Sequence, residues 1–119
     1  MTNYKKGAAF EFRVRNIFRR FGYEAERKAA SSPYDIIVMK NGKVVFIVDA
    51  KKTSQKDKSF IYVRRSDVEK IINESKKLGA KPLIVYGFYR TPVFVAFPEE
   101  MGKVIRLEVG KKLEDFLKS

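Results

Sequence analysis

Two β-rich runs joined by an Asn-Gly pair constrain the fold of this chain more than any other feature. Residues 35–39 and 43–48 are rich in Val and Ile, and Asn41-Gly42 lies between them. Asn and Gly readily adopt the left-handed backbone conformations that a tight hairpin turn requires. The pattern therefore predicts an antiparallel hairpin whose second strand is a central strand of a sheet.

The rest of the chain predicts helices around this hairpin. Apolar residues at helical spacing indicate an amphipathic first helix that ends before Gly22, and Ser66 to Glu69 has the form of a capping box. The expected order α-β-β-β-α-β-β predicts an α/β fold class, with a central mixed β-sheet flanked by helices in a single domain, 1–119. The expected helices cover 4–21, 66–78 and 111–117, and the expected strands cover 23–28, 35–39, 43–48, 60–63, 82–88, 93–97 and 104–107.

Charge and composition narrow the chemistry. The chain has 26 Lys and Arg against 14 Asp and Glu, a net charge of +12, so an anionic partner is expected, with nucleic acid ahead of a membrane surface. It contains no Cys and no His, which excludes thiolate nucleophiles, Ser-His-Asp triads and Cys- or His-ligated metals. A metal would have to be a hard, oxygen-liganded ion such as Mg²⁺ or Mn²⁺.

The chain also lacks membrane and export signals. No apolar run approaches the ~20 residues of a membrane span, and the N-terminus has no apolar signal-peptide core. These features predict a soluble, intracellular, cytoplasmic protein with no membrane partner.

Several acidic residues stand where apolar or neutral ones are expected. Asp49 ends an apolar strand, Lys51 falls on the same strand face, Asp35 begins the partner strand, and Glu11 faces inward from the first helix. Alone, each has a simpler explanation: a solvated strand edge, a turn residue, or for Glu11 an ion pair with Arg15. Together they favour a metal-dependent phosphodiesterase, in which carboxylates hold one or two Mg²⁺ and the lysine positions water or neutralises the phosphate.

The hairpin register tests this hypothesis. A two-residue loop would place Asp35 and Asp49 on opposite faces of the sheet, which rules out a shared site. A three-residue loop that pairs Met39 with Lys43 places both aspartates on the same face as Lys51. We therefore predict the three-residue loop, or a bulge further along the strand.

The pattern resembles the PD-(D/E)xK nuclease superfamily and, more narrowly, the archaeal-type Holliday junction resolvases. Pro33-Tyr34-Asp35 and Asp49-Ala50-Lys51 match the catalytic motif, Glu11 matches the helix-1 glutamate, and the resemblance covers nearly the whole chain. The sequence departs from the pattern at Tyr34, inserted between proline and aspartate, at Asp49, which replaces a glutamate, and at Phe12, which replaces an arginine.

The resemblance implies a restriction-endonuclease-like core and specific roles for these residues. Glu11, Asp35, Asp49 and Lys51 would be catalytic, and Asp35, Asp49, Glu11 and the backbone carbonyl of Ala50 would bind the metal. It also implies a homodimer that places two active sites across a four-way DNA junction and introduces paired nicks.

Basic and hydroxyl side chains are candidates for contacts to DNA phosphates, which position a substrate without reading its bases. The serines among them would bind phosphate or simply form the turn. The predicted DNA-binding residues are Lys5, Lys6, Arg13, Arg27, Lys28, Ser31, Ser32, Lys52, Lys56, Lys58, Arg64 and Arg65. A further set would fill either a dimer interface or the monomer core: Phe60, Tyr62, Val85, Phe88, Phe94 and Phe97.

Three functions therefore stay open. The chain would be a structure-selective DNA endonuclease such as a junction resolvase, a repair or restriction-like endonuclease, or a non-catalytic nucleic-acid-binding protein. The acidic set favours an enzyme, because carboxylates within a basic surface repel phosphate unless a cation is bound.

Overall fold

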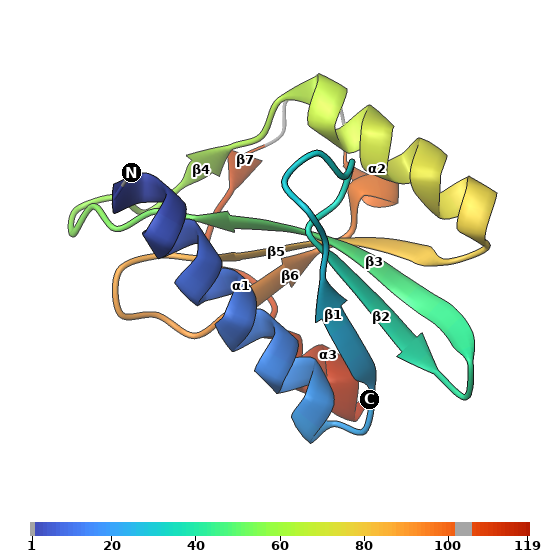
Figure 1. Ribbon diagram of the computed structural model, residues 1–119. Helices are drawn as coiled ribbons and strands as arrows, with labels where there is room; N and C mark the ends of the chain where they lie inside the picture. Colours follow the sequence, from blue (N-terminus) through green and yellow to red (C-terminus); the bar gives the residue numbers. More distant parts are fainter. Residues whose placement is uncertain (1, 102–105) are drawn as a thin grey trace.

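The computed structural model describes residues 2–101 and 106–119, with side chains from Ala8 onward in those ranges, and Figure 1 shows how its elements are arranged. The predicted elements form, with ends that move by a few residues. The elements are α1 (Thr2–Arg20), β1 (Glu24–Arg27), β2 (Ile36–Lys40), β3 (Lys43–Lys52), β4 (Ile61–Tyr62), α2 (Arg65–Leu78), β5 (Lys81–Gly87), β6 (Phe94–Ala96), the 3₁₀ turn η1 (Pro98–Glu100), β7 (Arg106–Leu107) and α3 (Leu113–Lys118).

The predicted mixed sheet is confirmed. Five strands pair in the order β1-β2-β3-β5-β6, with β3 and β5 parallel and the other pairs antiparallel. The parallel pair is connected through α2, as expected for a strand–helix–strand unit. Two of the predicted strands do not join this sheet: β4 and β7 form a separate two-stranded ribbon. The first part of the strand expected over 104–107 lies outside the described residues.

Helices cover both faces of the sheet, and a separate set of buried side chains lies on each face. On one face, Phe18 of α1 and Leu113 of α3 pack with the sheet residues Ile36 and Val48. On the other face, Ile71 of α2 packs against Ile47. Each fully buried side chain of this size contributes about 1.5–3 kcal/mol, so the central strands are held from both sides.

The turn between β2 and β3 contains two residues, not three. Lys40 pairs with Lys43, and the intervening Asn41 and Gly42 have φ of 53° and 76°, as a type I′ turn requires. The predicted three-residue loop is therefore wrong, because both turn residues tolerate the left-handed conformation and the shorter loop forms without strain.

The alternative prediction, a bulge further along the strand, is confirmed. Met39 pairs with Val44 but Val38 pairs with Phe46, so Val45 is an extra residue in β3. Val45 and Phe46 consecutively pack toward the α1 side of the sheet, and the normal alternation resumes at Ile47. Because of this extra residue, each later side chain of β3 points to the opposite face of the sheet from the one it would have in a regular hairpin. As a result, the strand ends that carry Asp35 and Asp49 lie side by side facing α2.

The predicted capping box at the start of α2 is wrong. The helix begins at Arg65 with Arg64 as N-cap, and no side chain caps it, because Ser66 already lies inside the first turn. Asp67 is the acidic residue of that turn, where a negative charge interacts favourably with the helix dipole. Gly79 ends the helix in the left-handed conformation, with φ of 65°, directly after the predicted last residue, Leu78.

In the ranges that the structure describes, no helix combines the length and apolarity needed to cross a bilayer.

The turn gives a stability prediction. Gly42→Ala should lower the free energy of unfolding by about 1–2 kcal/mol, because the left-handed conformation is costly for a residue with a Cβ. A Cβ at this position would meet no atom within 4 Å, so the loss would come from the backbone alone. Urea unfolding measures it, and the neighbouring exposed substitution Lys43→Ala should change stability by less than about 0.5 kcal/mol. Equal stability of Gly42→Ala and wild type would contradict the type I′ turn.

Candidate active site

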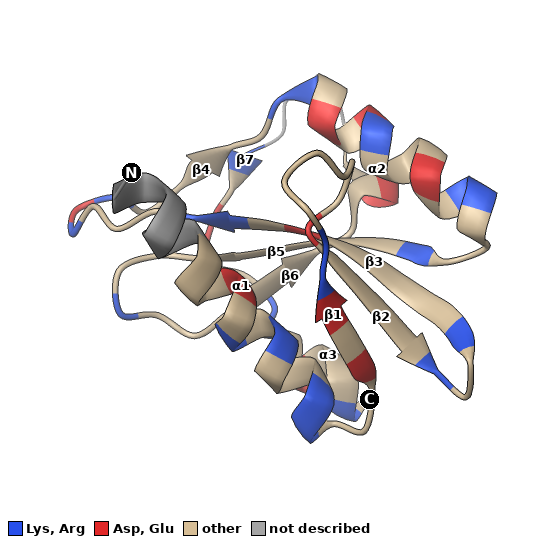
Figure 2. Cartoon of the chain, viewed as in Figure 1, with Lys and Arg blue, Asp and Glu red and all other residues tan. Residues whose placement is uncertain are grey.

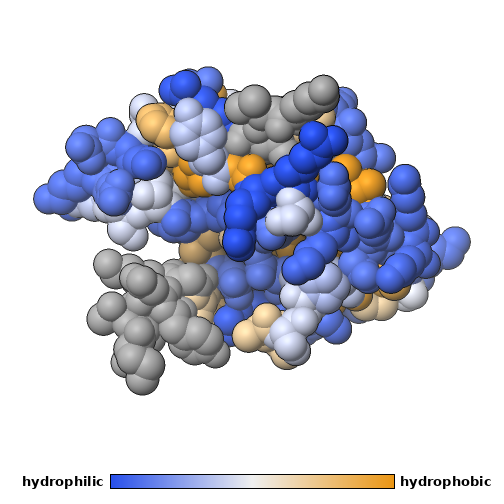
Figure 3. All heavy atoms as spheres, turned by 90° about the horizontal axis from the view of Figure 1, so that it is seen from above, coloured by the Kyte–Doolittle hydropathy of each residue, from blue (hydrophilic) through white to orange (hydrophobic). Residues whose placement is uncertain are grey.

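A polar cleft of about 310 Å³ lies on the α2 side of the sheet. Its walls are the loop between β1 and β2, the strand end at β3 and the start of α2. The surface seen from above, over α2 and this loop, is mainly hydrophilic (Figure 3). The cleft is lined by Ala30, Ser32, Pro33, Asp35, Asp49, Lys51, Arg64, Asp67 and Lys70.

Asp35 is held in place by backbone hydrogen bonds. The N–H of Ala50 donates to Oδ2 of Asp35 at 2.8 Å, and the N–H of Asp35 donates to the carbonyl of Val48 at 2.9 Å. The carbonyl of Asp35 in turn accepts from the N–H of Lys28 at 2.8 Å. The carboxylate therefore has one oxygen fixed against β3, beside Asp49.

Asp49 has the most strongly shifted pKa among the acids of the cleft. Its side chain is only 15% exposed, and the Asp35 carboxyl lies within hydrogen-bonding contact. Burial, and then the adjacent Asp35, raise the pKa of Asp49 from 3.8 to about 7, although the neighbouring Lys51 opposes this. Two carboxyl groups this close repel each other when both are charged, so they share the site with a proton or with a cation.

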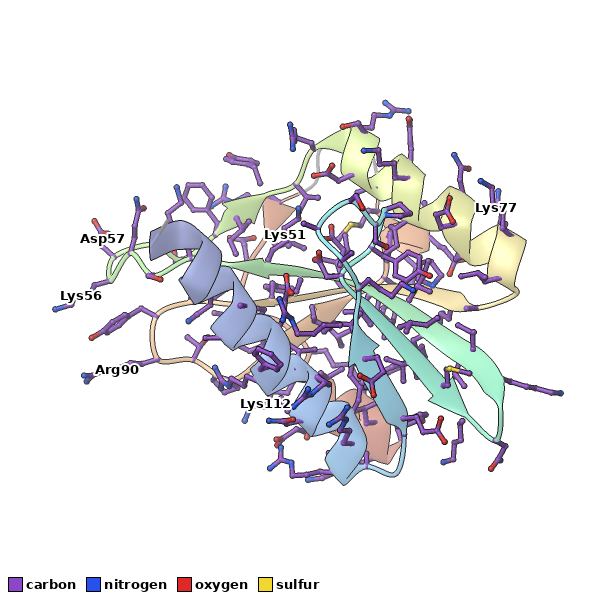
Figure 4. The ribbon with its side chains drawn as sticks, in the orientation of Figure 1. Lys51, Lys56, Asp57, Lys77, Arg90 and Lys112 are labelled. Atoms are coloured by element: carbon purple, nitrogen blue, oxygen red, sulfur yellow. The ribbon has the colours of Figure 1, made fainter. Side chains whose placement is uncertain are left out.

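Lys51 connects the two aspartates of β3 and α2. Its Nζ lies 3.4 Å from Oδ2 of Asp49 and 3.3 Å from Oδ2 of Asp67. Burial opposes its charge, but the two carboxylates outweigh burial and raise the pKa of Lys51 above its ordinary value. Lys51 is therefore an ammonium group at neutral pH. Figure 4 places it near the centre of the molecule, beside the loop that connects β1 to β2.

Asp67 is a cleft residue that the sequence analysis missed. It follows Lys51 by sixteen positions and comes close to it only because α2 begins beside the end of β3. Arg64 also approaches it, with Nε 3.6 Å from Oδ2. The available signal was an acid in the basic stretch that opens α2.

Glu11 stands apart from the two aspartates. Its Oε1 accepts from Nε of Arg27 at 2.9 Å, so its partner is on β1 and not the Arg15 considered from sequence. Burial raises the pKa of Glu11, and the charge of Asp35 adds to the effect while Arg27 opposes it. The predicted convergence of three carboxylates is therefore incomplete. Among the described residues, no three acidic side chains lie close enough to form a ready ligand set for a metal.

The cleft nevertheless fits a hard cation. Its ligand atoms are carboxylate oxygens, and a buried, repelling pair such as Asp35 and Asp49 lacks a counter-charge of its own apart from Lys51. The carbonyl of Ala50, predicted as a further ligand, belongs to the residue whose N–H already binds Asp35.

The predicted DNA-binding residues divide between the cleft and its surroundings. Ser32 and Arg64 line the cleft, and Oγ of Ser32 accepts from the N–H of Tyr34 at 3.4 Å, which is a turn contact. Exposed side chains elsewhere include Lys28, Ser31 and Arg65, the last paired with Glu69. The side chains of Lys5 and Lys6 lie outside the described residues.

Four more of the predicted DNA-binding residues contact other groups of the protein. Arg13 donates to the carbonyl of Thr91 at 3.1 Å, and Lys52 donates to the carbonyl of Phe88 at 3.1 Å. In the loop after β3, Lys56 lies over the ring of Tyr89 and Lys58 lies over the ring of Phe60. Lys and Arg positions occur along both long helices and in the loops (Figure 2), in a chain whose net charge is +12.

The candidate interface residues are mostly core. Val85, Phe88 and Phe94 are buried, and Phe97 packs partly buried against the α1-side cluster. Of the set, Tyr62 has the most exposed ring, at 62%.

Two aspartates and a lysine brought together on a mixed sheet define a class, the restriction-endonuclease-like nuclease fold. The family comparison agrees: residues 2–119 match the model described as "Archaeal holliday junction resolvase (hjc)". The chain belongs to this family, which confirms the resemblance inferred from its sequence. Membership in a resolvase nuclease family also implies a divalent metal cofactor.

Two relatives extend this result. The crossover junction endodeoxyribonuclease Hjc of Methanocaldococcus jannaschii is 32% identical over 92 residues, which cover 77% of this chain and 66% of that protein. The match thus spans just under two thirds of the relative's length. The structure of Hjc from Archaeoglobus fulgidus, described as a Holliday junction resolvase from an archaeal hyperthermophile, has a TM-score of 0.78 at 16% identity, over 95% of this chain and 96% of that one. This likeness confirms the fold.

The raised pKa of Asp49 predicts an unusual pH dependence of stability when divalent cations are chelated. The folded state holds this proton more tightly than the unfolded chain, so the proton stabilises the fold below pH 3.8 and that contribution is lost as pH rises through about 7. Asp49→Asn should not lose stability as pH rises through 7. Above pH 7 its free energy of unfolding should exceed that of wild type by about 2–4 kcal/mol.

Urea unfolding in EDTA over this pH range measures the effect. Asp57→Asn, in the exposed loop labelled in Figure 4, removes the same charge and should keep the wild-type pH dependence. If Asp49→Asn also keeps it, Asp49 does not carry a raised pKa.

Proposed function

We propose that this chain is a divalent-metal-dependent, structure-selective DNA endonuclease that resolves four-way junctions as a homodimer. The observation that carries the proposal is the contact of Asp35, Asp49 and Lys51 in one cleft of a strongly basic protein. Family membership supports the substrate class, because the family and its relative in Methanocaldococcus are named for junction cleavage. We further propose that residues 1–119 act as one nuclease domain.

The proposed metal is Mg²⁺ or Mn²⁺. Asp35 and Asp49 would hold it, with the carbonyl of Ala50 as a third ligand, and Glu11 would contribute only after release from Arg27. The preference for these ions follows from the oxygen-only ligand set in a chain without His or Cys. When bound, the metal activates water and offsets charge on the phosphate.

The remaining residues have roles that follow from their charge states. Hydrolysis bonds a water oxygen to phosphorus while one phosphate ester bond breaks, and negative charge builds on the phosphate oxygens. Lys51 is protonated, so it serves as a cation toward this charge and not as a general base. Asp67 and Asp49 both pair with this ammonium group and would keep it in the cleft. Ser32 and Arg64 would contact the phosphate backbone at the cleft.

Cleavage of defined DNA substrates tests the function. With Mg²⁺, wild type should cut a labelled four-way junction by paired symmetric nicks and leave a linear duplex and a flap uncut. Asp49→Asn should cut about a hundredfold more slowly or worse, because it removes a charged metal ligand. Asp57→Asn, with the same charge change on the exposed loop, should cut like wild type.

The result separates the alternatives. Cutting of linear DNA or flaps as fast as the junction would indicate a repair or restriction-like endonuclease. Junction binding with no cutting in either metal, or equal cutting by Asp49→Asn, would reject the catalytic proposal.

The proposed homodimer follows from the single cleft in each chain, since paired nicks require two. Sedimentation equilibrium should give twice the chain mass of 13.8 kDa at micromolar concentration. Symmetric nicking should also be lost at concentrations where the dimer dissociates. A stable monomer that still makes paired nicks would contradict this proposal.

A further inference from the structure

A second cavity, larger than the cleft, lies along α1. Its volume is about 850 Å³, and its walls come from α1, the loop between β5 and β6, and the residues that open α3. Ile17 and Val93 contribute to an apolar floor, and no residue of this groove is shared with the cleft. We call it the α1–α3 groove.

Positive charge dominates the groove. Four cationic side chains, Arg13, Arg20, Arg90 and Lys112, line it with a single acid, Glu114. Arg20 is paired with that acid at 2.6 Å, and Arg13 donates to a backbone carbonyl, which leaves its charge uncompensated. In the described parts of the chain, Arg90 and Lys112 make no ion pair, so the groove has an excess of cations that repel one another.

The loop that carries Arg90 is built to hold it there. Arg90 has φ of 56°, a left-handed conformation that costs a non-glycine residue about 1 kcal/mol or more. Oγ1 of Thr91 accepts from the N–H of Phe88 at 2.9 Å and fixes the turn. The ring of Tyr89 lies under the Arg90 guanidinium at 5.1 Å. A costly backbone conformation at an exposed cationic tip is typical of a residue kept for binding.

The groove and the cleft are separate surfaces, and only the groove is lined by α1. Residues two positions apart on a helix point about 200° away from each other, and Glu11 contacts Arg27 on β1 while Arg13 lines the groove. In Figure 4, Arg90 lies at the tip of its loop and Lys112 at the opposite end of the molecule from α2. The groove and the cleft share no lining residue, so they can contact different parts of one DNA molecule.

We infer that the α1–α3 groove binds the phosphate backbone of a second DNA arm while the cleft holds the strand to be cut. The inference rests on the proposed function and deepens it: one surface performs the cut and the other recognises the branch. A linear duplex engaged at the cleft lacks the second arm, so the groove contributes selectivity for branched DNA. Cations without acidic partners suit phosphates, because they bind by charge and release counterions.

The test removes the two groove cations that, in the described residues, have neither an ion pair nor a side-chain hydrogen bond, Arg90 and Lys112. Arg90→Gly is chosen because glycine keeps the left-handed backbone, and it is combined with Lys112→Ala, at an exposed position. The matched control, Lys76→Ala with Lys77→Ala, removes the same charge at the far end of α2, where Figure 4 labels Lys77. Thermal melting confirms that both proteins are folded.

Binding to a labelled four-way junction and to a linear duplex of the same arm sequence is measured over a range of salt, with Ca²⁺ in place of Mg²⁺ so that a divalent cation can offset the aspartates of the cleft. The groove variant should bind the junction about tenfold more weakly near 0.1 M salt, with a slope of log affinity against log salt smaller by about two. Its duplex affinity should stay within about twofold of wild type, as should both affinities of the control.

Two results would overturn the inference. If the groove variant loses affinity for the junction and the duplex equally, the groove contacts the same duplex as the cleft. If the groove variant binds both DNAs as the control does, the groove does not contact DNA. Wild-type cleavage is measured in parallel. If wild type cuts the junction and the groove variant binds it normally, only the groove assignment fails, whereas absence of wild-type cutting rejects the proposed function itself.

Discussion

The site depends on a one-residue irregularity in β3. With the two-residue turn at Asn41-Gly42, a regular hairpin would direct Asp35 and Asp49 to opposite faces of the sheet. The extra residue Val45 shifts the register by one, and the two carboxyl groups meet on the side of α2. The hydrogen bond from the Ala50 N–H to Asp35 then fixes the pair where the strands diverge. The contribution of Asp35 to the raised pKa of Asp49 and the suitability of the cleft for a cation both follow from that register.

The sequence predicted the part of the fold that local patterns control. Hydrophobic repeats located α1, the hairpin, α2 and β5. Left-handed glycines also marked the end of α1 at Gly22, the hairpin turn at Gly42 and the end of α2 at Gly79. A shared site for Asp35 and Asp49 also required a three-residue loop or a bulge in the hairpin, but the sequence does not determine which of the two forms. That choice depends on packing, since Val45 and Phe46 both reach the core below α1.

Long-range contacts explain what the sequence did not predict. The partner of Glu11 is Arg27 because β1 lies against α1, and nothing in the local spacing favours it over Arg15. Asp67 joins the cleft because the strand β3 ends where α2 begins, which depends on the tertiary fold. The aromatic residues considered for an interface turned out to pack mostly within the monomer, because a sheet covered on both faces needs two apolar layers.

The distribution of the acids explains how a basic protein keeps a carboxylate site. On the surface, Glu26, Glu69 and Glu114 each pair with an arginine, and Glu74 pairs with a lysine. In each of these pairs the two opposite charges cancel. The Lys and Arg residues that outnumber the acids are left to attract phosphate. In the cleft the balance is reversed: Asp35, Asp49 and Asp67 surround Lys51, with Arg64 at the edge. A phosphate drawn in by the surface would be repelled there unless a cation offset the aspartates. The surrounding positive charge and the local negative charge are therefore complementary: the first brings DNA to the cleft, and the second makes reaction there depend on a metal.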